Sequence, residues 1–125
     1  MRLISTTNAL APGGAYSQAV AIDGMLYTAG QVGADAATGV RPEDYRSEVR
    51  QALENLRAVL EAGGSSVSQV VRTMCLITDV DDFAVFNEIY AEFFGEHRPA
   101  RSTFCVGLAG GYLFEIEAFA HVGQQ

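Results

Sequence analysis

Basic residues are scarce in this sequence. Its 125 residues include 8 Lys and Arg against 15 Asp and Glu, so the formal net charge at pH 7 is −7. Binding to phosphate backbones depends mainly on Lys and Arg, and the same charges attract proteins to anionic membranes. The composition therefore argues against a nucleic-acid or membrane partner, and an anionic small molecule would need a local cation to bind.

Motifs for metal binding and thiol chemistry are missing. Cys75 and Cys105 form no CxxC pair and lie in apolar runs, so we expect two buried free thiols. His97 and His121 are 24 residues apart and have no partner at ligand spacing, which predicts no metal site. Neither cysteine has an activating residue near it in sequence, so a Cys-His nucleophile has little support.

Long apolar segments and phosphate-binding loops are missing as well. No apolar run approaches the ~20 residues that a membrane-spanning helix needs. The first eight residues lack the apolar core of a signal peptide, and no Gly-Lys-Ser/Thr sequence marks a phosphate loop. We therefore expect a cytoplasmic protein.

Hydrophobic residues make up 49% of the chain and charged residues 18%, as in globular proteins. The length fits one domain, which we expect to span residues 1–125. Asp23-Gly24 lies between two apolar runs and predicts a two-residue hairpin turn. The apolar and turn patterns predict the following elements: strands at 3–5, 19–22, 25–29, 70–78, 98–106 and 113–120, and helices at 44–62 and 83–94.

The last two predicted strands carry the candidate chemistry. If the glycine turn near 109–111 joins them as a hairpin, Arg101 lies opposite Glu117, with Glu115 diagonal on the same face. This prediction depends on register, because a slip of one residue moves Arg101 to the other face. From the residues alone, the ordinary interpretation is a structural ion pair. Tyr16 would ordinarily be a surface aromatic, and Asn87 a buried, hydrogen-bonded residue.

The order of elements predicts an α+β fold, with two helices covering one face of a six-stranded mixed sheet. The strand at 70–78 is apolar on both faces, which indicates a central position in that sheet. The uncovered face would then be unusually apolar for a monomer, which indicates a subunit interface.

Several motifs resemble those of the Rid (YjgF-like) family of reactive-intermediate deaminases, in order and at similar spacing. They are Gly14-Ala15-Tyr16-Ser17-Gln18-Ala19-Val20, Ala29-Gly30-Gln31, residues 82–90, Pro99-Ala100-Arg101-Ser102 and Glu115-Ile116-Glu117-Ala118. The resemblance implies a chorismate-mutase-like fold and a homotrimer with three clefts at its subunit boundaries. It also implies hydrolysis of imines or enamines to a carbonyl compound and ammonia, with no metal or organic cofactor.

The resemblance also implies roles for individual residues. Arg101 matches the arginine that binds the substrate carboxylate, through two charge-assisted hydrogen bonds. Glu115 matches the acidic residue that places or activates the attacking water. Three further residues match positions that line the cleft and bind substrate: Tyr16, Gly30 and Asn87.

Two departures from the family pattern bear on substrate preference. Ala29 stands where many members have serine, and Thr103 where many have cysteine. The turn between the last two strands is also shorter and lacks the usual Leu-Pro.

Three functions remain open from the sequence. The first is the deaminase, acting on a small imino or enamino acid. The second is a non-catalytic ligand-binding or regulatory trimer that uses the same cleft. The third is an RNA-acting protein, against which the net charge of −7 and the lack of a basic cluster weigh.

Overall fold

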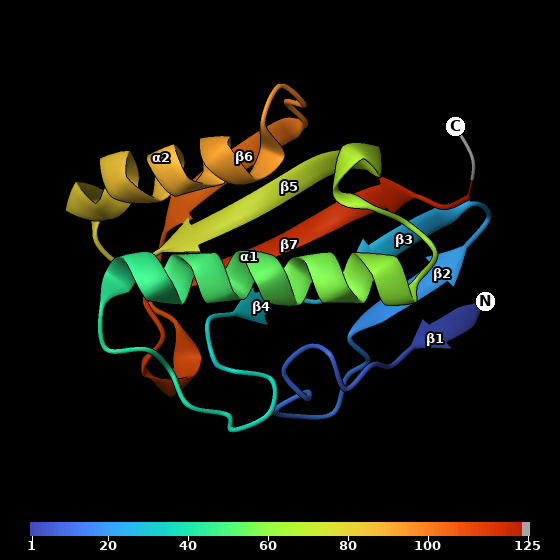
Figure 1. Cartoon of the computed structure of the whole chain (residues 1–125), viewed down its shortest axis with the longest axis horizontal. Coiled ribbons are helices and arrows are strands. Elements are labelled where there is room, and N and C mark those ends of the chain that lie inside the picture. Colours follow the sequence, from blue (N-terminus) through green and yellow to red (C-terminus); the bar gives the residue numbers. More distant parts are fainter. Residues whose placement is uncertain (124–125) are drawn as a thin grey trace.

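The computed structural model describes residues 1–123. Two helices pack side by side on one face of a mixed seven-stranded sheet and leave the other face uncovered (Figure 1). The helices are α1 (Tyr45–Ala62) and α2 (Phe83–Phe94). The strands are β1 (Arg2–Ile4), β2 (Ala19–Ile22), β3 (Met25–Thr28), β4 (Gln31–Val32), β5 (Val70–Ile77), β6 (Ala100–Cys105) and β7 (Phe114–His121).

The α+β arrangement is as predicted, with one strand more. The sheet order is β1-β2-β3-β7-β5-β6, and the two-residue strand β4 pairs with β7 beyond the end of β3. The sequence predicts six strands, because it indicates no separate strand at residues 31–32 after the one at 25–29. Asp23 and Gly24 both have positive φ, as the predicted hairpin turn requires.

Both predicted helices form with the expected ends. The Asp44 side chain caps α1 by accepting a hydrogen bond from the Ser47 backbone N–H at 2.9 Å, and Gly63 ends this helix. Gly95 ends α2 with φ 65°. The core lies between these helices and the sheet, and its largest fully buried apolar side chains are Phe86, Phe114, Leu26, Leu53, Leu56, Leu60 and Ile116.

The predicted terminal hairpin is wrong. Strand β6 pairs in parallel with β5, and β7 pairs antiparallel with β5 on its other edge, so β5 separates the two strands. The β5–α2–β6 segment is a parallel crossover, which places β6 beside β5. Strand β7 then takes the remaining edge of β5, and residues 106–113 connect two strands that are not neighbours.

This topology decides which way the charged side chains point. Arg101 pairs with buried Thr73, so both face the helices, whereas Glu115 and Glu117 pair with Leu76 and Met74 on the uncovered face. Arg101 and the two glutamates therefore lie on opposite faces of the sheet.

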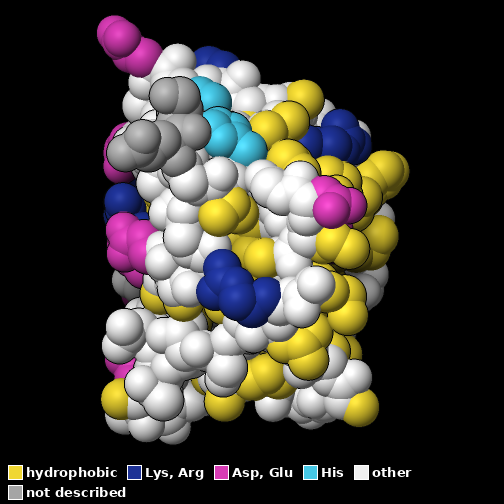
Figure 2. Space-filling model, turned by 90° about the vertical axis from the view of Figure 1, so that its right-hand side faces the viewer, with side chains coloured by type: hydrophobic (Ala, Val, Ile, Leu, Met, Phe, Trp, Pro, Cys, Tyr) yellow, Lys and Arg dark blue, Asp and Glu magenta, His cyan; other side chains and the backbone are white. Residues whose placement is uncertain are grey.

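The uncovered face of the sheet is rich in exposed apolar side chains. Tyr27 and Phe119 stack edge to face at 5.1 Å and are 38% and 37% exposed, and Phe104 is 49% exposed. In Figure 2 this face lies toward the right, where hydrophobic side chains gather, while charged side chains lie mainly on the helix side. Such an apolar surface is consistent with the expected subunit interface.

Candidate active site

Arg101 lies on edge strand β6 against an aromatic surface of α2. Its guanidinium carbon is 4.6 Å from the ring centroid of Tyr90, 5.1 Å from that of Phe86 and 5.7 Å from that of Phe83. Its Nη1 donates a hydrogen bond to Asn87 Oδ1 at 2.8 Å. We call these five residues the arginine cluster. The rings attract the cation and restrict its movement, while Asn87 fixes its direction.

The spacing of residues along α2 builds this cluster. Phe83, Phe86, Asn87 and Tyr90 follow at intervals of three and four, so they share one face of the helix. The Tyr90 hydroxyl forms a buried hydrogen bond of 2.8 Å with Thr73 Oγ1, which holds the ring against β5. Burial is the main reason that the pKa of Tyr90 is raised, so its hydroxyl stays neutral.

The predicted ion pair of Arg101 with a strand glutamate is wrong. Within residues 1–123, no carboxylate oxygen lies within 4.0 Å of its guanidinium, and Glu115 and Glu117 are on the other face of the sheet. Arg101 is half-buried. A half-buried arginine whose side-chain partner is a neutral amide can still take an anionic ligand.

Glu115 lies apart from the arginine cluster, in a pocket of about 560 Å³ that we call the glutamate pocket. Its walls come from residues 10–16, from Gly30 and Val32, and from residues 109–112. Strand β4 positions the carboxylate, because Val32 pairs with Glu115 across the β4–β7 ladder.

Gly30 packs directly on the Glu115 carboxylate. A Cβ atom placed on Gly30 would lie 2.2 Å from Glu115 Oε2 and 2.6 Å from its Cδ, so a side chain there would displace the carboxylate. Burial raises the pKa of Glu115, and the neighbouring Glu117 raises it further. A desolvated carboxylate of raised pKa is suited to accept and return a proton.

Tyr16 borders the same pocket from the glycine-rich loop. Its hydroxyl accepts a hydrogen bond from the Gly13 backbone N–H at 3.0 Å, and its side chain is exposed. Buried Gln18 holds the loop by donating to the carbonyls of Thr6 and Leu10 at 3.1 and 2.9 Å. The structure therefore brings Tyr16, Gly30 and Glu115 together, and separately brings Arg101 and Asn87 together.

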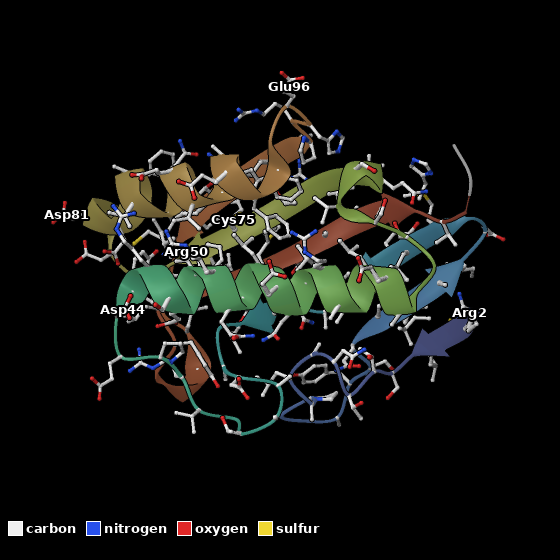
Figure 3. All side chains as sticks on the ribbon, viewed as in Figure 1. Arg2, Asp44, Arg50, Cys75, Asp81 and Glu96 are labelled. Atoms are coloured by element: carbon white, nitrogen blue, oxygen red, sulfur yellow. The ribbon has the colours of Figure 1, made fainter. Side chains whose placement is uncertain are left out.

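The two cysteines differ from each other. Cys75 is fully buried on β5 beneath the helices (Figure 3), and burial raises the pKa of its thiol to about 12, so it is inert near neutral pH. The prediction that Cys105 is also buried is wrong, because it lies at the exposed end of edge strand β6. There it borders a hollow of about 350 Å³ together with Thr103 and Phe83.

Two polar residues of α1 that support the glutamate pocket were not predicted. Glu48 and Asn55 are both fully buried among the apolar residues of the helix. Asn55 Nδ2 donates to the carbonyls of Val32 and Ala34 at 2.9 Å each, which holds the end of β4 and the residues after it. Their spacing of seven residues could have revealed them in the sequence, because it places both on the apolar stripe of the helix.

Comparisons with known proteins identify the family of this chain. A family model described as endoribonuclease L-PSP matches residues 6–122. The 2-iminobutanoate/2-iminopropanoate deaminase of Rattus norvegicus is 43% identical over 124 residues, which cover 98% of this chain and 90% of the relative. A RutC family protein of Pyrococcus horikoshii is 44% identical over 121 residues, which cover 95% of this chain and 96% of the relative.

Solved structures of the same kind superpose closely. RidA from an Antarctic Psychrobacter has a TM-score of 0.95 at 36% identity, covering 98% of this chain and 100% of that one. E. coli TdcF with bound serine has a TM-score of 0.93 at 36% identity, with the same coverage. The chain belongs to the L-PSP endoribonuclease family, also called the Rid or YjgF-like family.

Proposed function

We propose that this protein hydrolyses 2-imino and enamine acids of the 2-iminopropionate and 2-aminoacrylate type to 2-keto acids and ammonia. The reaction takes place in three clefts at the subunit boundaries of a homotrimer and uses no cofactor. Curated relatives named 2-iminobutanoate/2-iminopropanoate deaminase, at 42 to 44% identity, support the activity.

The observation that carries the proposal is the placement of Arg101 and Glu115 on opposite faces of one sheet. A single chain cannot direct both side chains at one small substrate. In a cyclic trimer every boundary joins two different surfaces of neighbouring subunits. Each cleft then takes the arginine cluster from one subunit and the glutamate pocket from the next.

Arg101 binds the substrate carboxylate. One terminal nitrogen is bonded to Asn87, and the remaining donors of the planar guanidinium can still form charge-assisted hydrogen bonds. The aromatic rings beneath it hold the plane in one direction. Fixing the carboxylate fixes the neighbouring imine carbon, so that one positioned water can attack it.

Glu115 acts as the general base and then as the general acid. As the water oxygen bonds to the imine carbon, the C=N electron pair moves to nitrogen, and the carboxylate accepts one water proton. It returns that proton to nitrogen, which gives a neutral carbinolamine. The carboxylate then transfers the hydroxyl proton to the nitrogen, so that the C–N bond breaks, ammonia leaves and the C=O bond forms. An enamine substrate first takes a proton on carbon and gives up one from nitrogen, which converts it to the imine.

The test is ammonia release from freshly generated 2-iminopropionate, compared with the spontaneous rate and with Arg101→Ala. We expect acceleration by the wild-type chain at a mass three times 13.4 kDa. A pure monomer in sedimentation equilibrium, or ammonia release no faster than in buffer, would reject the proposal.

A ligand-binding trimer is the second candidate. It is favoured by the structure of the relative TdcF with bound serine, an amino acid with a free carboxylate. Calorimetric titration with serine and pyruvate distinguishes the two functions. Binding that depends on Arg101, together with unaccelerated imine hydrolysis, would favour this candidate.

RNA cleavage, which the family model's description names, has less support in this chain. The net charge of −7 opposes phosphate binding. A filter-binding assay with single-stranded RNA at low and high salt tests it, and we expect no salt-dependent binding.

A further inference from the structure

Glu48 is a fully buried carboxylate in the first turn of α1. Its Oε2 accepts a hydrogen bond from the Leu113 backbone N–H at 2.7 Å, and its Oε1 accepts one from Arg41 Nη1 at 3.0 Å. Neither the reaction proposed above nor the packing of the helix against the sheet requires an acid at this position.

A buried charge is costly unless it is paired, and an apolar side chain of similar size is often at least as stable in its place. The position near the start of the helix favours a negative charge, but only modestly. What distinguishes Glu48 from an apolar residue is therefore the backbone group that it holds.

That group lies at the edge of the glutamate pocket. Leu113 is preceded by Tyr112, which lines the pocket, and Glu115 follows two residues later. Gly33 packs on the Glu48 backbone so closely that a Cβ atom there would lie 2.1 Å from the Glu48 carbonyl oxygen. Glu48 thus contacts both segments that frame Glu115, namely the residue after β4 and the residue before β7.

We propose that Glu48 is a positioning residue, whose hydrogen bond to Leu113 holds the start of β7 so that the Glu115 side chain is correctly placed for the reacting water. The inference rests on the proposed deaminase function. Through this hydrogen bond, a buried residue of α1 affects the position of a site residue on β7. Arg41 completes the pairing of the buried charge.

The matched variants are Glu48→Ala and Glu48→Gln. Both remove the charge, but only glutamine keeps an oxygen that can accept the Leu113 N–H, so a difference between them reports that hydrogen bond. We expect Glu48→Ala to lower kcat roughly tenfold or more, since a misplacement of about 1 Å can cost about 10²-fold. KM should change little, because Arg101 binds the substrate. Glu48→Gln should retain most of the rate.

A second readout is the pH profile of kcat/KM. Burial raises the pKa of Glu115, so loosening of its segment should move the acid limb to lower pH in Glu48→Ala but not in Glu48→Gln. The control is Glu54→Ala, which removes an exposed glutamate of the same helix that pairs with Arg57. A lowered thermal midpoint with unchanged kcat and pH profile in Glu48→Ala would overturn the proposal.

A third readout does not depend on catalysis. The Leu113 amide should exchange slowly with solvent in the wild type and in Glu48→Gln, and quickly in Glu48→Ala. If the wild type releases no ammonia, the proposed function fails, while this exchange still decides whether Glu48 holds the segment. Equal protection in all three chains would overturn the positioning role.

Discussion

Replacement of Arg101 separates a substrate-binding role from a structural one. Arg101→Ala removes the guanidinium that bonds to Asn87 and lies over three aromatic rings. Arg101→Lys keeps the charge, but a single ammonium cannot reproduce the planar fork. The two variants therefore test the charge and the geometry separately.

The expected loss of activity is large. Two hydrogen bonds to a charged carboxylate contribute about 1.5–3 kcal/mol each. At about 1.4 kcal/mol for each factor of ten, Arg101→Ala should lower kcat/KM by about 10² to 10⁴. Arg101→Lys should fall between this variant and the wild type.

The expected loss of stability is small. Arg101 has no carboxylate partner among residues 1–123, so its removal leaves no buried acid there unpaired. The lost cation–π contacts amount to about 0.5–2 kcal/mol. A loss of 1 kcal/mol corresponds to a fall of about 4 °C in the thermal midpoint.

Two quantities are measured for each chain: ammonia release from freshly generated 2-iminopropionate, and the thermal midpoint of unfolding. Arg98→Ala is the control, because it removes an exposed arginine close to β6 and changes the net charge equally. An Arg101→Ala protein that is less stable but fully active would refute the assignment of Arg101 to the substrate carboxylate.

Three further predictions follow from the site. Gly30→Ala should abolish most activity, because its Cβ would meet the Glu115 carboxylate at 2.2 Å. Gly13→Ala should keep its activity, because the space around its Cβ in the same pocket is open; steady-state kinetics of both variants checks this. Glu117→Gln should lower the pKa of Glu115 by removing a like charge, so the acid limb of the kcat/KM profile should move to lower pH, and an unmoved limb would contradict it. Cys105→Ser should keep turnover within about threefold, because hydrolysis here uses no thiol, and a loss of activity in a folded trimer would restore a thiol mechanism.

The fold could be predicted largely from local patterns. The apolar stripe and the capping residues of α1 predicted its ends. The two apolar faces of β5 predicted an interior strand, and β5 is paired on both edges, although it lies next to edge strand β6. The position of β7 could not be predicted in this way. A glycine turn between two strands predicts a hairpin, but the parallel crossover through α2 had already placed β6 on one edge of β5.

The position of β7 also determines which candidate residues lie close together in one chain. The family motifs indicated Arg101 and Glu115 as a candidate pair, but the faces of the sheet on which they lie depend on the register of β6 and β7 with β5. Only the structure shows that these two residues belong to separate clusters within one chain. Glu48 was missed because a glutamate in an amphipathic helix is ordinarily solvated, and its backbone partner lies 65 residues away.

The most direct test of a cleft shared between subunits is complementation between Arg101→Ala and Glu115→Ala chains. The two chains are co-expressed with different tags and purified as mixed trimers. If each cleft takes Arg101 from one subunit and Glu115 from the next, every mixed ring contains one intact cleft. The purified mixed trimers should then show about a third of the wild-type rate, although each variant alone is nearly inactive. A mixture no more active than its parent variants would contradict the shared cleft.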